Sequence, residues 1–533
     1  MKTNIKFEYF VYSLPIILYY FLFFQYAVNA PKWDDFAIIQ FVNEISNEPN
    51  LSNKISFLLK QHNEHRIVFT RVIALVDYYI FGKVNFIHLM FVGNLALLLI
   101  VFLIVKMVFQ KTKKFILCFV LLLFWHSLCF YENIFWGMAA IQNFWIIAWF
   151  LLSLYFLLNN SKYRILVYFF TLIAVYTSGN GILLISIYSL FFLVKQDTRL
   201  FLKWIIFGFI ILIAYFFNYR IPSQNNLTQF DFLIFLKSVF LLAGSMTEGL
   251  ILPVKQYLFV MVFGIIISLF SFYKIFILGF KIFTKKEFSN SELSLFAILF
   301  FCFGTIFMVV FSRCGQIELE GFLLSRYKVY SVLLVSVLLI SFVESFNFGG
   351  VIQLFILISV LFWFVCIQHY FLFFTINQRH FFTTMVFNWG NLKSNTGENQ
   401  LQSWEGVIPF VYSNQVNKID STNSIKIRDK VHFEVSDYLN NNLLDNGLYL
   451  LLRNRKNIFL FPFIQNPKHS YRNLFNYSDF YEIGALFDSN LYEMGVLPGY
   501  YQVELYDRGV VHSWKGQTIY IPDIKSKEVE KNW

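Results

Sequence analysis

The sequence predicts a polytopic α-helical membrane protein of about eleven transmembrane helices, followed by a β-rich or α+β domain at the C-terminus. Of its 533 residues, 57% are hydrophobic and 14% are charged, and the mean hydropathy is +0.58. A soluble protein of this size could not bury so much apolar surface. Apolar segments of membrane-spanning length recur as far as residue 375, and the composition then becomes richer in Asn, Asp and Ser. We therefore predict a transmembrane domain over 1–375 and a separate domain over 376–533.

The first predicted span covers about residues 9–28. Lys2 and Lys6 precede it, which places the N-terminus in the cytoplasm. Residues 28–30 faintly resemble a signal-peptide cleavage site, but Pro31 would follow the cut. We therefore expect an uncleaved membrane span rather than a secretion signal.

A long, mostly polar stretch over about residues 31–84 separates the first two spans. Within it, segments 36–45 and 55–59 mix apolar and polar residues in the way of helices that lie on a membrane surface, and 67–81 is either a third such helix or a short buried one. This stretch is predicted to be the first outer loop and to carry the catalytic residues.

Ten further apolar segments follow this loop. They lie at about 85–105, 115–131, a stretch ending near 159, 165–177, 182–194, 201–217, 257–278, 293–311, 329–342 and 351–370. The pair 165–177 and 182–194 is short for spans, so this hairpin is expected to stop below the outer surface. Residues 218–255 are predicted to be an external segment.

An odd number of spans places the tail on the side opposite the N-terminus. Basic residues concentrate in the short loops on the N-terminal side, as the positive-inside rule requires. That distribution also accounts for the net charge of +11, so no nucleic-acid partner is expected. The predicted location is the bacterial inner (plasma) membrane, with the tail extracytoplasmic.

The tail contains four short runs typical of β-strands, at 448–452, 458–461, 500–505 and 518–521. With about 150 residues it can support a core of its own. The five cysteines all lie in or beside apolar segments and form no CxxC pair, which indicates buried thiols rather than a disulfide framework or a zinc site.

The first candidate site is the sequence Trp33-Asp34-Asp35-Phe36, directly after the first span. The aromatic residues would hold both carboxylates at a fixed depth in the interface. Adjacent carboxylates raise each other's pKa, which would suit a general base near neutral pH. The alternative is an ordinary solvated loop that ends the span.

A second polar group, Glu64, His65 and Arg66, ends the same loop. Glu64 and His65 are proton acceptors near neutral pH. His62 and His65 are three residues apart and no HExxH is present, so we predict no defined metal site, although a divalent cation is possible. The alternative is a helix cap with exposed charges.

Two outer arginines form a third group, Arg313 in Ser312-Arg313-Cys314 and Arg326 in Ser325-Arg326-Tyr327. Guanidinium groups bind phosphate in a bidentate manner, and a lipid phosphate would lie at this depth. The alternative is that the two side chains extend to phospholipid headgroups.

Two outer turns, 132–137 with Gln142 and Asn143, and 178–181, contain glycine and amide side chains. They are either plain tight turns or places where backbone approaches a ligand closely. No P-loop, GxGxxG or GxSxG pattern is present, so nucleotide-binding and serine-hydrolase functions lack support.

Together, these features resemble the C-type membrane glycosyltransferases (GT-C class). The resemblance rests on the acidic Asp34-Asp35 pair after the first span, the interface helices over 36–66, about eleven spans and the outer domain over 376–533. The combination of 33–36, 63–66 and 325–327 also resembles a bacterial branch of such proteins. The WWDYG-type motif of oligosaccharyltransferases is absent, so transfer to an Asn sequon is not expected.

The resemblance implies a function. A sugar carried on polyprenyl phosphate would be transferred, with inversion, to a cell-envelope glycan or lipid acceptor on the outer face of the membrane. Asp34 would be the general base, and Asp35 would orient the acceptor or help to hold a divalent cation. Arg313 or Arg326 would neutralise the departing phosphate. Glu64, His65, Arg66 and Tyr327 would complete the substrate site.

Three other functions stay open at this point. An O-antigen polymerase or ligase also uses many spans and outer arginines. A transporter or flippase of lipid-linked substrates would need ionisable residues midway through its spans and repeated halves, and the sequence has few such charges and no repeat. A non-catalytic scaffold would merely present the tail domain.

Overall fold

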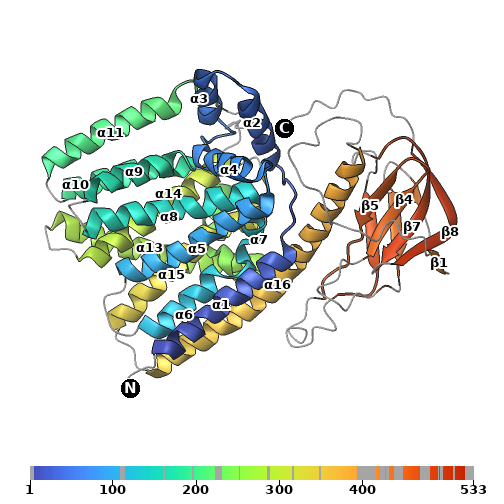
Figure 1. Ribbon diagram of the computed structural model, residues 1–533. Helices are drawn as coiled ribbons and strands as arrows, with labels where there is room; N and C mark the ends of the chain where they lie inside the picture. Colours follow the sequence, from blue (N-terminus) through green and yellow to red (C-terminus); the bar gives the residue numbers. More distant parts are fainter. Residues whose placement is uncertain are drawn as a thin grey trace. The chain divides into compact units, whose positions relative to one another are not determined.

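The computed structural model of the chain is shown in Figure 1. It describes residues 5–108, 114–159, 163–194, 197–221, 231–250, 253–284, 289–314, 317–346 and 350–392, and in the tail residues 416–419, 426–427, 431–436, 438, 448–468, 481–489, 491, 496–507 and 510–521. The chain divides into two compact units. The first comprises Met1–Ala27 and Pro31–Leu372, and the second Val28–Ala30 and Phe373–Trp533.

The first unit is a bundle of apolar helices. In the part of the chain that the structure describes, nine helical segments are long and apolar enough to cross a membrane. They belong to α1 (Ile5–Tyr26), α5 (Phe86–Val108), α6 (Lys114–Trp125) with η1 (Leu128–Phe130) and α7 (Tyr131–Ile134), α8 (Gly137–Asn159), α11 (Thr198–Phe216), α13 (Pro253–Phe283), α14 (Asn290–Arg313), α15 (Lys328–Phe346) and α16 (Gly350–Leu392). The helices agree with the predicted polytopic membrane architecture.

The predicted pair of short apolar segments forms two helices of 12 residues each, α9 (Arg164–Val175) and α10 (Leu183–Val194). The 3-10 turn η3 (Gly179–Ile182) joins them. A Cβ atom on Gly181 would lie 2.4 Å from the carbonyl oxygen of Ala174, so only glycine allows this turn to close.

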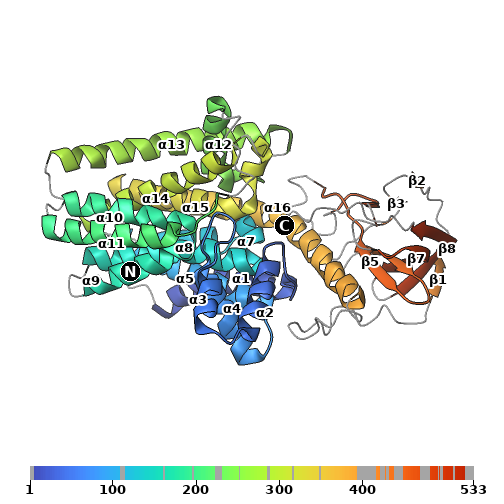
Figure 2. The same cartoon turned by 90° about the horizontal axis from the view of Figure 1, so that it is seen from above.

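Three helices of the first loop gather at one end of the bundle, as both views show (Figures 1 and 2). They are α2 (Asp35–Asn47), α3 (Leu51–Leu59) and α4 (Val68–Phe81). Helix α2 packs on α3, α4 and α8. The three helices confirm the helical reading of segments 36–45, 55–59 and 67–81.

The segment 218–255, which was predicted to be external, differs from that prediction. It contains an apolar helix, α12 (Phe232–Gly244), followed by the 3-10 turn η5 (Ser245–Thr247). Figure 2 shows α12 beside α13. Cβ atoms on Gly244 and Gly264 would lie 2.0 Å and 1.8 Å from carbonyl oxygens of the facing helix, so the two backbones are in direct contact. Residues 232–247 therefore belong to the bundle.

The second unit is β-rich. Strands β1 (Val416–Ile419), β8 (Val510–Ile521), β7 (Gly499–Asp507), β4 (Leu448–Arg453) and β5 (Ile458–Pro462) form one sheet in that order, with only the β1–β8 pair parallel. A smaller sheet has the order β2 (Lys426–Ile427), β3 (Val431–Val435) and β6 (Ala485–Ser489). All four predicted strands are present. Asn388 in α16 exchanges two hydrogen bonds with the backbone of Leu460, at 2.8 and 2.7 Å.

Candidate functional site

Asp35 is a structural anchor. Its side chain is fully buried, and its two oxygens accept the backbone N–H groups of Met138 at 2.8 Å and Lys32 at 3.1 Å. Met138 is the second residue of α8, so the carboxylate satisfies a free N–H at the positive end of that helix. Burial raises the pKa of Asp35 to about 7, although these two hydrogen bonds and the charge of Lys32 lower it. The side chain ties the first loop to α8.

Asp34 has a different environment. Its side chain is 39% exposed, and its Oδ1 lies 3.8 Å from Nε2 of His62. Burial raises its pKa, but the nearby His62 and Asn63 side chains and the positive charge of Arg326 outweigh burial and leave the pKa below its ordinary value. The expectation that the adjacent carboxylates raise each other's pKa is wrong for Asp34, because the two side chains face different partners. Asp34 is the ionised, accessible member of the pair.

Unusual backbone conformations present these side chains. Trp33 and Asn63 both have positive φ, +42° and +46°. Asparagine tolerates this region and tryptophan rarely adopts it, so the surroundings must hold Trp33 in place. Its ring packs edge-on against Trp136 at 5.0 Å, with the ammonium of Lys32 4.6 Å from the ring centre. Such strain in a packed loop is typical of functional sites.

A tight turn carries the second predicted group. His62 and His65 exchange two backbone hydrogen bonds of 2.8 Å, which places Asn63 and Glu64 at the tip. Nδ1 of His65 accepts the N–H of Gly179 in η3 at 3.2 Å. Burial lowers the pKa of His65, so its imidazole is neutral near pH 7. The turn is thereby fixed against the α9–α10 hairpin.

A cavity of about 360 Å³ opens beside this turn. It brings together Glu64, His65, Arg313 and Tyr327, four of the predicted site residues, although they lie on segments about 250 residues apart in the sequence. Its other lining residues are mainly aromatic, amide and hydroxyl side chains from α8, η3, α11, α14 and α15. They include Asn143, Ser178, Asn180, Tyr215, Tyr219, Thr305 and Tyr330. Its volume and mixed lining are typical of a small-molecule site.

Two guanidinium groups lie close to the ring of Tyr327, which lines this cavity; Arg313 is also a lining residue, whereas the predicted Arg326 is not. The Cζ atoms of Arg313 and Arg326 lie 5.9 Å and 5.2 Å from the ring centre of Tyr327, and Arg326 also lies 5.9 Å from the ring of Trp136. Among the residues that the structure describes, neither arginine forms an ion pair with a carboxylate. Arg313 can therefore meet an anionic ligand in the cavity, whereas the charge of Arg326 also acts on Glu132 and Asp34.

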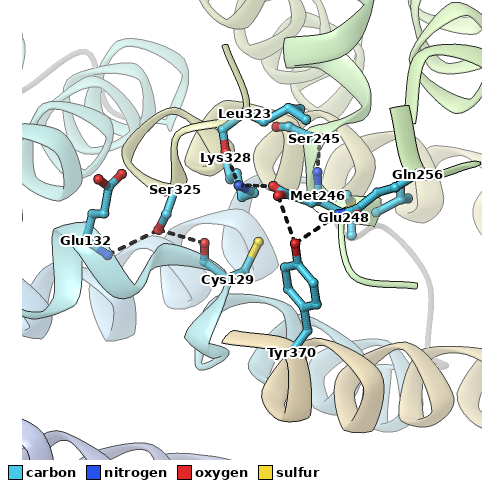
Figure 3. Close-up of polar contacts among 12 residues, drawn as sticks. Cys129, Glu132, Ser245, Met246, Glu248, Gln256, Leu323, Ser325, Lys328 and Tyr370 are labelled. Carbon is cyan, nitrogen blue, oxygen red and sulfur yellow. Dashed lines mark hydrogen bonds and ion pairs between the residues drawn. The ribbon is translucent and has the colours of Figure 1, made fainter. Parts of the chain in front are cut away.

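The backbone that carries Arg326 is held on both sides. The N–H of Arg326 donates to Oε2 of Glu132 at 3.0 Å, and its carbonyl accepts from Nδ2 of Asn133 at 3.0 Å. Ser325 donates to the carbonyl of Cys129 at 3.0 Å and accepts the N–H of Glu132 at 3.1 Å (Figure 3). The 3-10 turn η7 (Ser325–Tyr327) is therefore tied to the outer turn 132–137.

A buried ion pair holds the other end of this segment. The ammonium of Lys328 lies 2.5 Å from Oε2 of Glu248, with side chains 1% and 14% exposed. Lys328 also donates to the carbonyl of Leu323, and the Tyr370 hydroxyl lies 3.4 Å from Oε1 of Glu248 (Figure 3). The pair lies next to Tyr327 in the sequence, so it contributes to the position of that ring.

Arg66, the remaining predicted arginine, lies away from this cavity. Its side chain is buried, and its Nε donates to the carbonyl of Tyr215 at 2.6 Å. Its two terminal nitrogens donate to the carbonyls of Leu59 and Phe217. The structure thus places Arg66 as a clamp between the ends of α3 and α11, and it does not line the cavity with Glu64 and His65.

Several residues of this site carry little signal in the sequence. Tyr215 lies in α11, Tyr219 follows that helix, and Tyr330 lies in α15. In the sequence, nothing distinguishes them from the other tyrosines of an aromatic-rich chain. Asn180 and His62, in contrast, lie in segments whose polarity or glycine content does mark them as candidate ligand-binding turns. Among the described residues, no group of three or more His, Cys, Asp or Glu side chains could hold a metal ion.

Comparisons of the chain with protein-family models, with curated proteins and with solved structures find no match.

Proposed function

We propose that this chain is an integral membrane glycosyltransferase that moves a sugar from a polyprenyl-phosphate donor to a hydroxyl group of a cell-envelope glycan or lipid. One observation carries the proposal: Asp34 is an ionised, partly exposed carboxylate on which the charge of Arg326 acts, and the loop that carries it also lines, through Glu64 and His65, a cavity that contains Arg313. The charge of Arg326 acts on Asp34, and the charge of Asp34 acts on His65 in the cavity wall.

In this mechanism the acceptor hydroxyl gives its proton to Asp34 as its oxygen attacks the anomeric carbon. The bond between that carbon and the phosphate oxygen breaks, and the lipid phosphate leaves with the electron pair, so the configuration inverts. Arg313 and Arg326 stabilise the charge that develops on the phosphate. Asp35 keeps the loop in register with α8 and contacts no substrate.

The cavity fits a single sugar ring. At about 360 Å³ it is near the lower end of ordinary ligand sites, about 300–1,000 Å³. Tyrosine rings would pack against the apolar faces of the sugar, and Asn143 and Asn180 would bond its hydroxyls. Glu64 lines this cavity and would bind a hydroxyl of the donor sugar or the acceptor.

We also propose that the end of the bundle that carries α2, α3 and α4 faces outward in a bacterial plasma membrane, and that residues 376–533 form an extracytoplasmic domain, as an odd number of spans implies. Basic residues such as Lys106, Lys203 and Lys281 lie at the opposite ends of their helices, where the positive-inside rule places the cytoplasm.

The test is turnover by the purified full-length protein with polyprenyl-phosphate sugars and an acceptor glycan, read as release of polyprenyl phosphate. We expect product with the wild type and none with Asp34→Asn. The cavity variant Asn180→Asp should change the preferred sugar while Asp34 is intact. Movement of lipid-linked donor across a vesicle membrane without cleavage would instead establish a flippase, and elongation of a lipid-linked glycan would establish a polymerase.

A further inference from the structure

A second, larger cavity lies on the other side of the turn formed by residues 60–66. Its volume is about 790 Å³, and three of its lining residues, Lys60, Arg66 and Arg220, are cationic. None of the residues that line it is a carboxylate. Glu64 lines only the first cavity, so the turn separates two chemically different sites.

Hydrogen bonds within the protein hold the wall of this cavity in place, so the cavity is preformed. The side chain of Gln61 accepts the N–H of Arg220 at 2.9 Å and donates to its carbonyl at 2.7 Å, which joins the turn to the segment after α11. Asn218, at φ +54°, lets the chain bend there. The Arg66 guanidinium bridges the ends of α3 and α11 as described above. The side chains of Lys60 and Arg220 take no part in these bonds and are exposed at the rim.

An apolar surface adjoins the cavity. Leu51, Ile55 and Leu59 recur every fourth residue on α3 and are 71%, 49% and 38% exposed. Phe217 and Ile221, which line the cavity, are 68% and 78% exposed. In a membrane protein, helix faces of this kind contact lipid at the interface. A ligand here would meet hydrocarbon-compatible side chains next to a cationic recess.

We propose that this cavity binds the phosphate headgroup of an anionic phospholipid from the surrounding bilayer, with its acyl chains along the exposed residues of α3 and α11. A phosphodiester fits the guanidinium of Arg220 and the ammonium of Lys60, and a lipid of net negative charge complements a site with these two exposed cations and no lining carboxylate, since the donors of Arg66 are occupied by backbone carbonyls. A zwitterionic lipid would bring its own cation into that site. The proposal requires only the membrane location and does not depend on sugar transfer.

Binding would support the catalytic turn. Arg66 lies 5.9 Å from the ring centre of Tyr215, which lines the first cavity, and Asn63 lines the second cavity while its side chain helps to lower the pKa of Asp34. A lipid phosphate at Lys60 and Arg220 would thus order the same turn that presents His62 and Asn63 to Asp34.

The experiment is native mass spectrometry of the full-length protein, titrated with phosphatidylglycerol or phosphatidylcholine of identical acyl chains. We expect phosphatidylglycerol to bind at least about tenfold more tightly, and the double variant Lys60→Gln/Arg220→Gln to lose about 25-fold of that affinity, about fivefold for each charge. The control is Lys203→Gln/Lys237→Gln, which removes the same charge from exposed lysines outside the cavity and should change binding less than twofold.

Equal affinity for the two lipids, or equal losses in the cavity and control variants, would overturn the proposal. So would a polyprenyl phosphate that displaces phosphatidylglycerol and binds in its place with higher affinity, since the cavity would then be a donor site. The Asp34→Asn protein should bind phosphatidylglycerol as the wild type does. Loss of sugar transfer and loss of lipid binding are therefore separate results.

Discussion

Replacing the two adjacent aspartates one at a time should separate chemistry from folding. In Asp34→Asn the amide keeps the shape of a side chain that is 39% exposed and 3.8 Å from its histidine partner. Partly exposed ion pairs of this kind contribute at most about 1 kcal/mol to stability. The lost base, in contrast, should lower turnover by about 10²- to 10⁴-fold. We expect a folded, inactive protein.

Asp35→Asn should behave in the opposite way. The carboxylate accepts two backbone N–H groups, at 2.8 and 3.1 Å, and an amide can accept only one of them through its oxygen. The NH2 group would then face the second N–H donor, which costs one hydrogen bond to a charged group, about 1.5–3 kcal/mol. We expect a lower unfolding temperature and a smaller folded yield, with turnover per folded molecule largely kept.

The assay pairs thermal unfolding in one detergent with turnover of a lipid-linked sugar, both normalised to folded protein. A stable but inactive Asp35→Asn together with an active Asp34→Asn would exchange the two roles and refute the reasoning.

The pH profile gives an independent check. The folded-state pKa of Asp34 lies below its ordinary value of 3.8, so Asp34 is ionised throughout the range from about pH 5 to 8. Its contribution to stability is present above the unfolded pKa and is lost as the pH falls through the folded pKa. We therefore expect no acidic limb in turnover between about pH 5 and 8. An acidic limb in that range that disappears in His65→Gln would identify the histidine as the base.

Two further changes test the supports of the site. Gly179→Ala should reduce turnover, because its Cβ would lie 2.7 Å from Nδ1 of His65. Gly279→Ala, inside α13 and with nothing within 4 Å of the new Cβ, should leave turnover unchanged and should not lower the unfolding temperature. Lys328→Met should lower the free energy of unfolding by about 3–5 kcal/mol, because it leaves Glu248 as an uncompensated buried charge, and Lys328→Met/Glu248→Leu should recover most of that loss in thermal unfolding. No recovery in the double variant would show that the ion pair is not the cause.

Hydropathy and periodicity were enough to predict most helices of the bundle. A span must be apolar over its whole length, and an interface helix must carry its apolar residues on one face. Helix α12 was not predicted, because it does not meet the length that a membrane span requires. Its 13 residues are too few to cross a membrane, and the sequence gives no sign that Gly244 and Gly264 bring its backbone against α13. The strands of the tail were predictable from their composition and the turns between them.

The site itself depends on long-range geometry. Asp34 and Asp35 are chemically identical neighbours, and only the position of the start of α8 decides which of them is buried. Similarly, the cavity draws Tyr215 and Tyr330 from α11 and α15, so no local pattern distinguishes them from structural tyrosines. The sequence indicated the segments that meet and left the role of each side chain undecided.

The three predicted arginines show how the fold decides availability. Arg66 follows the end of α3 by seven residues and lies beside the end of α11, and both helices end in carbonyl groups without helical partners. Those carbonyls occupy its donors, and the negative ends of the helix dipoles offset its charge. Arg313 and Arg326 have aromatic rings as neighbours instead, and among the described residues no helix-end carbonyl is recorded as an acceptor for either side chain. A substitution of either should therefore act on phosphate binding, whereas a substitution of Arg66 should act first on the fold of the loop.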